Sequence, residues 1–247
     1  MTTSIAGHKG DEPVATFRLI PSRKGLIVIW ALLIAVNFNL INLYPDVAVT
    51  GLIGNDEGMH LLATDLAVQS IIQRQDFTDP WQSAIGMGHP LFHYYQHLPH
   101  VSVALVHVLT FRVFPIVDMV NWTSYLLLSL FPLSLYWSMR LFGFDQLSSA
   151  MGGLVASLTA TNSLFRFGFG SYIDRGLYTQ LWAMVLLPPA LALGYRVLQG
   201  AHGYFWAALL LAATLMSHLL YGYMAFLTLG VLTFLQPGRL LNPKAIA

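Results

Sequence analysis

"GLIVIWALLIAVNFNLINL", residues 25–43, is the stretch that decides the fold. It holds 19 residues without a charge, close to the ~20 that a helix needs to cross a lipid bilayer. Arg23 and Lys24 stand directly before it. A secretory signal has a shorter apolar core and a cleavage site of small residues, whereas this segment continues into "YPD". The pattern predicts an uncleaved anchor, with residues 1–24 as a cytoplasmic tail.

The composition of the whole chain supports this interpretation. Of its 247 residues, 56% are hydrophobic and only 9% are charged, against roughly 25% charged residues in soluble domains. The chain therefore lacks the polar surface of a soluble globule and needs lipid as its solvent. A formal net charge of +1 argues against nucleic acid as a partner. Since the chain has no cysteine, disulfides, thiolate metal sites and cysteine nucleophiles are excluded.

The remaining apolar segments predict an all-α, polytopic transmembrane helix bundle over residues 25–247. These segments are about 119–138, 147–165, 178–195, 204–218 and 219–236, with a shorter one at 98–114. If 98–114 lies in the membrane interface instead of crossing, the positive-inside rule is satisfied. The residues that then become cytoplasmic are Arg140, Arg196, Arg239 and Lys244. We therefore expect a multi-pass protein of the cell membrane, with a large extracytoplasmic first loop, residues 44–118, that contains interfacial helices.

The first chemical pattern of this loop follows the anchor, in "NDEGMHLLAT", residues 55–64. Asn55 or Asp56 is a natural N-cap for a helix that runs to about Arg74, with Glu57 in its first turn. Asp56, His60 and Thr64 are spaced to share one helix face. An Asp beside a His at the membrane surface can act as a general base or a metal ligand. The alternative is a helix cap followed by a solvated face.

The second pattern is "DFTDPWQSAIGMGHPLFHYYQHLP", residues 76–99. Its Gly-Met-Gly and Asp-Pro steps predict turns, and a helix is expected from Pro90. On that helix four histidines lie close to one stripe, and they are His93, His97, His100 and His107. Either they form a zinc site, or they are a polar stripe whose aromatic neighbours face lipid headgroups. A single straight helix usually supplies two ligands, so the stripe is favoured and no metal or other cofactor is expected.

Two further places carry polar groups. The segment "GSYIDRGLYTQLW", residues 170–182, sets Asp174 and Arg175 at the mouth of an apolar helix. Arg175 would suit a phosphate, or it is an arginine that extends to the membrane surface. His218 separates two apolar segments and is either a polar cap between helices or a further group of the same site.

Taken together, these motifs resemble those of the GT-C superfamily of integral-membrane glycosyltransferases. More narrowly, the chain is similar to the bacterial membrane proteins called 6-pyruvoyl-tetrahydropterin-synthase-related. The similar parts are the D-x-x-x-H start at Asp56, the Gly-Pro-aromatic run from Gly88 to Tyr94, and the Tyr-x-x-Arg-Gly segment from Tyr172. Gln180 departs from the pattern, because an acidic residue is expected there. Such enzymes usually continue with more helices, so we expect this chain to be the N-terminal part of a longer protein.

The resemblance implies a transferase that takes a sugar from a polyprenyl-phosphate carrier on the outer face of the membrane. Asp56 would deprotonate the acceptor hydroxyl, with His60 and Glu57 as the other catalytic candidates. The expected substrate-binding residues are Arg175, Asp174, His89, Tyr94, Tyr95 and His218. Two other classes remain open: a transporter or flippase that uses Asp56, Arg175 and His218, and a non-catalytic membrane assembly subunit.

Overall fold

A computed structural model describes residues 22–48, 56–83, 86–160 and 177–235, which are mostly helical. Asp174, Arg175 and most of the predicted tail lie outside the described residues, as do Arg239 and Lys244. The long helices begin and end close to the predicted apolar segments. The elements are α1 (Arg23–Ala48), α2 (Glu57–Ile72), β1 (Trp81–Gln82), β2 (His89–Pro90), α3 (Leu91–Tyr94), α4 (Leu98–Leu109), α5 (Ile116–Phe142), α6 (Gln146–Ala160), α8 (Tyr178–Leu198), α9 (Tyr204–Ser217) and α10 (Leu219–Phe234).

Three of the described helices are long and apolar enough to cross a membrane. They cover Arg23–Pro45, Ile116–Phe142 and Tyr178–Leu198. Helix α4 is an apolar helix of 12 residues, about 18 Å at 1.5 Å per residue. That is well short of the ~30 Å hydrocarbon core, so α4 alone cannot span it.

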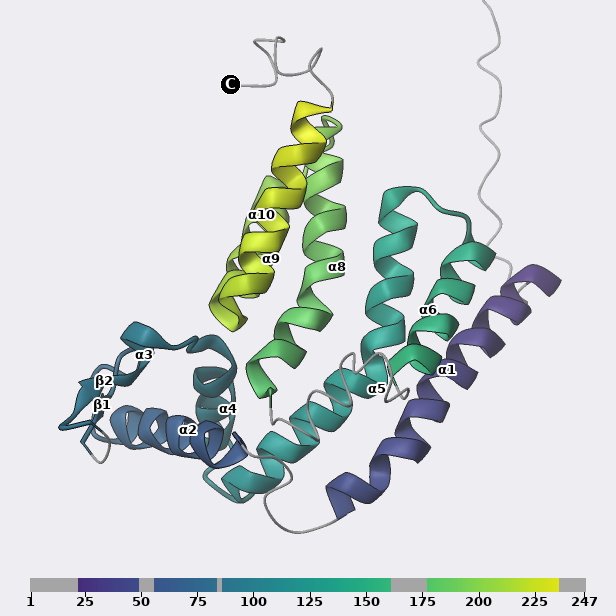
Figure 1. Ribbon diagram of the computed structural model, residues 1–247. Coiled ribbons are helices and arrows are strands. Elements are labelled where there is room, and N and C mark those ends of the chain that lie inside the picture. Colours follow the sequence, from purple (N-terminus) through teal and green to yellow (C-terminus); the bar gives the residue numbers. More distant parts are fainter. Residues whose placement is uncertain (1–21, 49–55, 84–85, 161–176, 236–247) are drawn as a thin grey trace, which may run out of the picture.

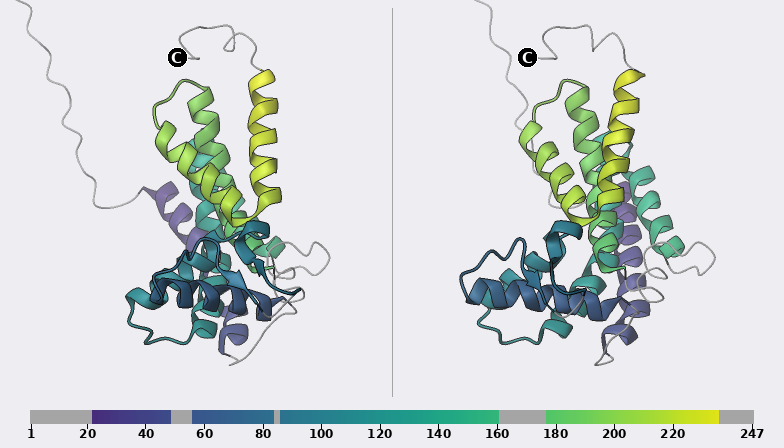
Figure 2. Two further views of the ribbon diagram at one scale, coloured as in Figure 1. Left: turned by 90° about the vertical axis from the view of Figure 1, so that its left-hand side faces the viewer. Right: turned by 60° about the vertical axis from the view of Figure 1, so that its left-hand side comes forward.

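The long helices form two neighbouring groups (Figure 1). Helices α1, α5 and α6 pack on one another, α8, α9 and α10 form the second group, and α5 packs against α8. In the two views of Figure 2 the second group lies toward the viewer, in front of the first. We call these six helices the bundle. Residues 56–83 and 86–109, with α2, α3, α4 and the β1–β2 hairpin, lie together at one end of the bundle, and we call them the end unit.

Charge is distributed unequally along the bundle axis. The start of α1, the end of α5 and the end of α8 lie at the end of the bundle opposite the end unit (Figure 1). These helix ends carry Arg23, Lys24, Arg140 and Arg196. The end unit instead carries five acidic residues, namely Asp56, Glu57, Asp65, Asp76 and Asp79.

Helix α5 bends part of the way along its length (Figure 1), and the sequence explains the bend. Pro132 lies inside α5, and a proline supplies no N–H to the carbonyl four residues earlier. That carbonyl belongs to Leu128, and the buried Asn39 of α1 donates to it from Nδ2 at 3.1 Å. A Cβ built on Gly153 of α6 would come 2.8 Å from the Pro132 carbonyl oxygen, so only glycine lets α6 approach the bend this closely.

The same solution recurs in α8, which contains Pro188 and Pro189. Pro189 leaves the carbonyl of Val185 without its helical donor. Ser134 of α5 donates to this oxygen from Oγ at 2.6 Å. Neighbouring helices therefore supply hydrogen bonds that the prolines remove, as membrane helices require.

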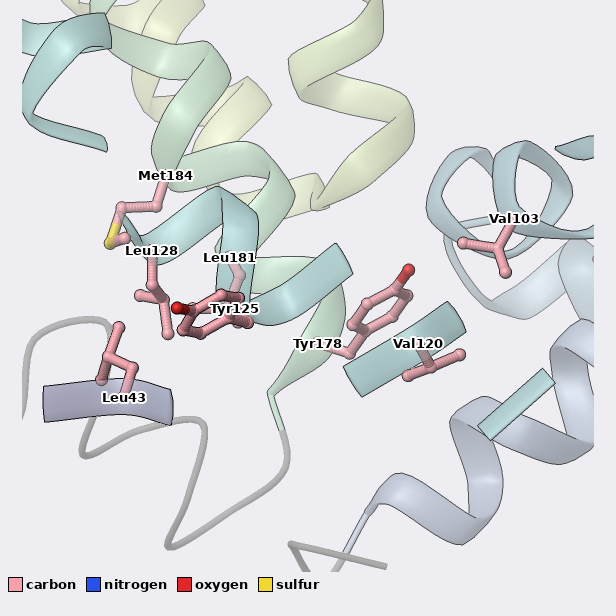
Figure 3. Packing of buried hydrophobic residues seen from close by; sticks show 8 residues of the cluster. All are labelled: Leu43, Val103, Val120, Tyr125, Leu128, Tyr178, Leu181 and Met184. Atoms are coloured by element: carbon pink, nitrogen blue, oxygen red, sulfur yellow. The ribbon is translucent and has the colours of Figure 1, made fainter. Parts of the chain in front are cut away.

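An apolar core joins the bundle to the end unit (Figure 3). It contains residues of α1, α4, α5 and α8, namely Leu43, Val103, Val120, Tyr125, Leu128, Tyr178, Leu181 and Met184. Tyr178, the first residue of α8, is fully buried. It lies beside Val120 of α5, with its hydroxyl directed toward Val103 of α4 (Figure 3). A second core packs α2 against α3 and α4 around Ala63, Ala67 and Ala104.

One local prediction is wrong. The expected helix from Pro90 breaks at Tyr95, whose backbone is extended with φ −135° and ψ 152°. α4 then starts afresh, with Pro99 in its first turn, where a proline costs no hydrogen bond. Because of the break, the histidines do not form one stripe: His93 is exposed, whereas His100 and His107 are buried. Phe92 is also buried, against α2, and so does not face lipid.

Candidate functional site

The centre of the candidate site is a buried pair of histidines. His60 on α2 and His100 on α4 meet through their ring nitrogens, with 3.0 Å between Nδ1 of His60 and Nε2 of His100. Both side chains are inaccessible to solvent, at 1% and 0% exposure. The rings are nearly parallel, with an interplanar angle of 21°. The pair therefore links the two main helices of the end unit.

Aromatic rings enclose the pair. Tyr95, in the extended link before α4, places its ring centroid 6.0 Å from His60 and 5.9 Å from His100. Tyr178 of the bundle lies 5.5 Å and 5.9 Å from the same two rings. Phe92 stacks on His100 at 5.6 Å. The histidines thus lie where the end unit contacts the bundle.

The second nitrogen of His100 is also engaged. Its Nδ1 lies 3.1 Å from the backbone oxygen of Gln96. Burial lowers the pKa of His100 to about 3, its electrostatic interaction with the His60 ring contributes in the same direction, and the contact with the Gln96 carbonyl partly opposes both. An imidazole with this pKa is neutral at neutral pH.

Asp56 lies at the edge of this cluster. It occupies the N-cap position of α2, as predicted, but makes no side-chain cap hydrogen bond, and it is exposed. Burial raises the pKa of Tyr95, a hydrogen bond with the Thr179 side chain opposes this rise, and the charge of Asp56 adds to it. The carboxylate therefore acts electrostatically on Tyr95, and the tyrosine in turn bonds to the first turn of α8.

Glu57 follows Asp56 in the first turn of α2 but has the opposite environment. Its side chain is 1% exposed, on the buried side of the helix that also carries His60 and Thr64. The hydroxyl of Thr64 donates to the backbone oxygen of His60 at 2.9 Å. Of the two adjacent carboxylates, only Asp56 presents itself to solvent.

His89 and Tyr94 lie apart from the histidine pair. The hairpin pairs Gln82 with His89, and its turn uses positive φ at Gly86, Met87 and Gly88, which fits the predicted Gly-Met-Gly turn. The His89 and Tyr94 rings contact each other with centroids 6.4 Å apart. Tyr94 is exposed. These two residues form a separate surface of the end unit.

His218 connects α9 to α10 in an extended conformation and makes no side-chain cap bond. Its ring packs edge-on against Tyr221 at 5.3 Å. The Tyr221 hydroxyl accepts a hydrogen bond of 3.3 Å from the Gln180 side chain of α8. His218 is thus a junction residue joined to α8 through Tyr221. Gln180, where the resemblance leads us to expect an acidic residue, therefore has a structural role, because its side-chain amide can donate this hydrogen bond to Tyr221.

Across the described part of the chain, no three His, Asp or Glu side chains are grouped so that they could hold a metal ion. The sequence did not predict that His100 is the partner of His60. It also did not predict that Tyr178 and Thr179 of α8 take part in the site. One signal for His100 was present: it lies within the apolar helix "LPHVSVALVHVL", where a polar ring needs a buried partner.

Fold and site together define a helical protein with membrane-spanning potential and a polar, aromatic cluster at one end of its bundle. Comparisons with models of known families, with curated proteins and with solved structures found no match.

Proposed function

We propose that this protein is a GT-C-like membrane glycosyltransferase, which moves a sugar from a polyprenyl-phosphate carrier to an acceptor hydroxyl. The observation that carries the proposal is the exposed carboxylate of Asp56, which starts α2 beside a buried aromatic and histidine cluster. Glycosyl transfer to a hydroxyl needs a base near the acceptor. Asp56 offers its oxygens because they are not used in capping α2.

The distribution of charge supports an orientation for the reaction. The basic residues Arg23, Lys24, Arg140 and Arg196 are gathered at the end of the bundle opposite the end unit. Cytoplasmic segments favour Lys and Arg. We therefore place the protein in the cytoplasmic membrane. Its N-terminus then lies in the cytoplasm and the end unit on the extracytoplasmic face.

The proposed reaction is a single displacement at the anomeric carbon of the sugar. The carboxylate of Asp56 takes the proton of the acceptor hydroxyl as the acceptor oxygen bonds to that carbon. The bond from the carbon to the phosphate oxygen breaks, and polyprenyl phosphate leaves as an anion with the bonding electrons. Neither a nucleotide nor a redox partner is needed, since the lipid phosphate is itself the leaving group. Arg175 remains the sequence-based candidate for binding this phosphate.

Transport is the less favoured alternative. Transporters place ionisable groups near the bilayer midplane. In the described parts of α1, α5 and α8, the ionisable Asp, Arg and Lys residues lie near the helix ends, as Asp118 and Arg140 do in α5. The polar groups deeper in these helices are neutral, such as Asn39 and Ser134.

The test compares Asp56→Asn with Asp65→Asn in proteoliposomes that contain a radiolabelled polyprenyl-phosphate hexose and a soluble sugar acceptor. Asp65 is a matched control because it is exposed on the same helix. Losing a positioned base costs roughly 10²–10⁴-fold in rate, so Asp56→Asn should lose turnover while Asp65→Asn keeps it. Asn caps a helix as well as Asp, and the thermal melting of both variants should match the parent. Equal activity of the two variants would remove Asp56 from the mechanism.

A further inference from the structure

The hydrogen bonds around His100 determine which nitrogen of His60 carries its proton. The Gln96 carbonyl can only accept, so Nδ1 of His100 must donate to it. In a neutral ring the other nitrogen, Nε2, is then an acceptor. That nitrogen contacts Nδ1 of His60 at 3.0 Å, so Nδ1 of His60 carries the hydrogen that joins the two rings.

The alternatives are unfavourable. If Nδ1 of His60 accepted, a neutral His100 would have to donate from Nε2 and present a lone pair to the Gln96 carbonyl. A doubly protonated His100 could donate to both neighbours, but its pKa of about 3 excludes this form at neutral pH. One arrangement therefore remains: Nδ1 of His60 donates to Nε2 of His100, and Nδ1 of His100 donates to the backbone oxygen of Gln96.

We propose that His100 is a positioning residue, which fixes His60 as the Nδ1–H tautomer and so makes Nε2 of His60 a hydrogen-bond acceptor in the site. This assignment of a role rests on the proposed function, whereas the tautomer itself does not. The arrangement follows the general rule that one ring nitrogen of a functional histidine is fixed by the bond that the other makes.

The tautomer limits what His60 can receive. An unprotonated imidazole nitrogen accepts from hydroxyl or N–H groups and repels an anionic phosphate oxygen. Because the His60 side chain is buried, this nitrogen acts within the enclosed cluster, and the acceptor hydroxyl is left to Asp56, which is exposed at the start of the same helix.

Two amide substitutions separate the two bonds of His100. In His100→Gln the side-chain amide reaches the position of Nε2, and its oxygen can still accept from His60. In His100→Asn the shorter amide takes the place of Nδ1, so it keeps the bond to the Gln96 carbonyl and loses the one to His60. Both variants bury a neutral amide and differ only in which bond survives.

The first measurement is ¹⁵N NMR of histidine-labelled full-length protein, with the His60 signals assigned by their loss in His60→Gln. We expect a protonated Nδ1 and an unprotonated Nε2 at His60 in the parent and a mixed tautomer in both variants, with the larger share of the Nδ1–H form in His100→Gln, whose amide oxygen can still accept. A parent protein with His60 protonated at Nε2 would overturn the proposal, whether or not the protein transfers sugar.

The second measurement is sugar transfer by the same variants. His100→Asn should lose roughly 10–100-fold in turnover, the loss seen when the partner that orients a metal-binding histidine is removed, and His100→Gln should recover most of it. Equal turnover in the two variants would disprove the positioning role. A parent with no transfer activity would contradict the proposed function but leave the tautomer result standing.

Discussion

The bundle and the end unit are both mostly helical, but different kinds of hydrogen bond hold their helices together. In the bundle, side chains such as Asn39 and Ser134 donate to backbone oxygens of neighbouring helices. In the end unit, the two main helices are instead joined by a contact between side chains, His60 to His100. A bundle in lipid must satisfy its backbone internally, and under the proposed function the end unit lies outside the lipid, where its polar side chains can form a site.

Backbone geometry separates the two regions further. Among the described residues, non-glycine residues with positive φ occur only in the end unit and the turn that follows it, at Arg74, Met87, Phe111 and Arg112. Such conformations are uncommon and cost free energy. The end unit thus holds two of these four residues together with five acidic residues, and the bundle supplies the frame that carries it.

The largest expected effect concerns the sidedness of the two regions. Because the chain has no native cysteine, single cysteines report position without background. Ser83→Cys lies exposed in the end unit, and His202→Cys lies exposed in the α8–α9 turn at the opposite end of the bundle. An impermeant thiol reagent on intact cells should label Ser83→Cys and leave His202→Cys unlabelled until the cells are permeabilised. The reverse pattern would invert the proposed orientation.

The second effect concerns pH, and it is followed at His100 in the end unit. The folded-state pKa of His100 is lowered to about 3 from an ordinary value of 6.5. Between these values the unfolded chain binds more protons than the folded one, so stability is full above about 6.5 and falls as the pH drops. The slope reaches at most about 1.4 kcal/mol per pH unit.

The measurement is hydrogen exchange, corrected for its intrinsic pH dependence, in α4 of the end unit and in α5 of the bundle. Protection of α4 should fall on acidification while that of α5 is retained, and the loss should be smaller in His100→Gln, which has no imidazole at this position. His60, His97, Tyr95 and Asp56 also act on this cluster, so the variant is the necessary reference. An identical loss in parent and variant would exclude His100 as its cause.

The smallest effect tests the bundle. Asn39→Ala leaves the Leu128 carbonyl without a donor, which should cost roughly 1 kcal/mol of stability, the usual size of a hydrogen bond between membrane helices. Asn37→Ala is the control, because Asn37 is exposed on the same helix and donates only to Leu33 within it. Thermal melting in detergent should fall for the first variant and stay nearly unchanged for the second. A similar shift in both would mean that the interhelical bond contributes little.

The sequence predicted the bundle better than the site, for physical reasons. Apolar runs report burial or lipid contact over many residues, so α1, α5, α8 and α10 begin and end within a few residues of the predicted segments. The partner of His60 could not be predicted, because it lies 40 residues away and depends on how α2 crosses α4. The break at Tyr95 also escaped prediction, since one helix was expected from Pro90 and the structure has two, α3 and α4.

The two proline-containing helices have a consequence for how the chain is made. In both cases the side chain that supplies the replacement bond comes earlier in the sequence: Asn39 precedes Leu128, and Ser134 precedes Val185. Since synthesis proceeds from the N-terminus, each proline-interrupted helix emerges from the ribosome when its donor has already been made. The carbonyls of Leu128 and Val185 therefore need no partner that is still to be translated. The order of the helices along the chain therefore favours assembly during synthesis. A circular permutation that moved α1 behind α5 would place Asn39 after Leu128, so that α5 would be made before its donor.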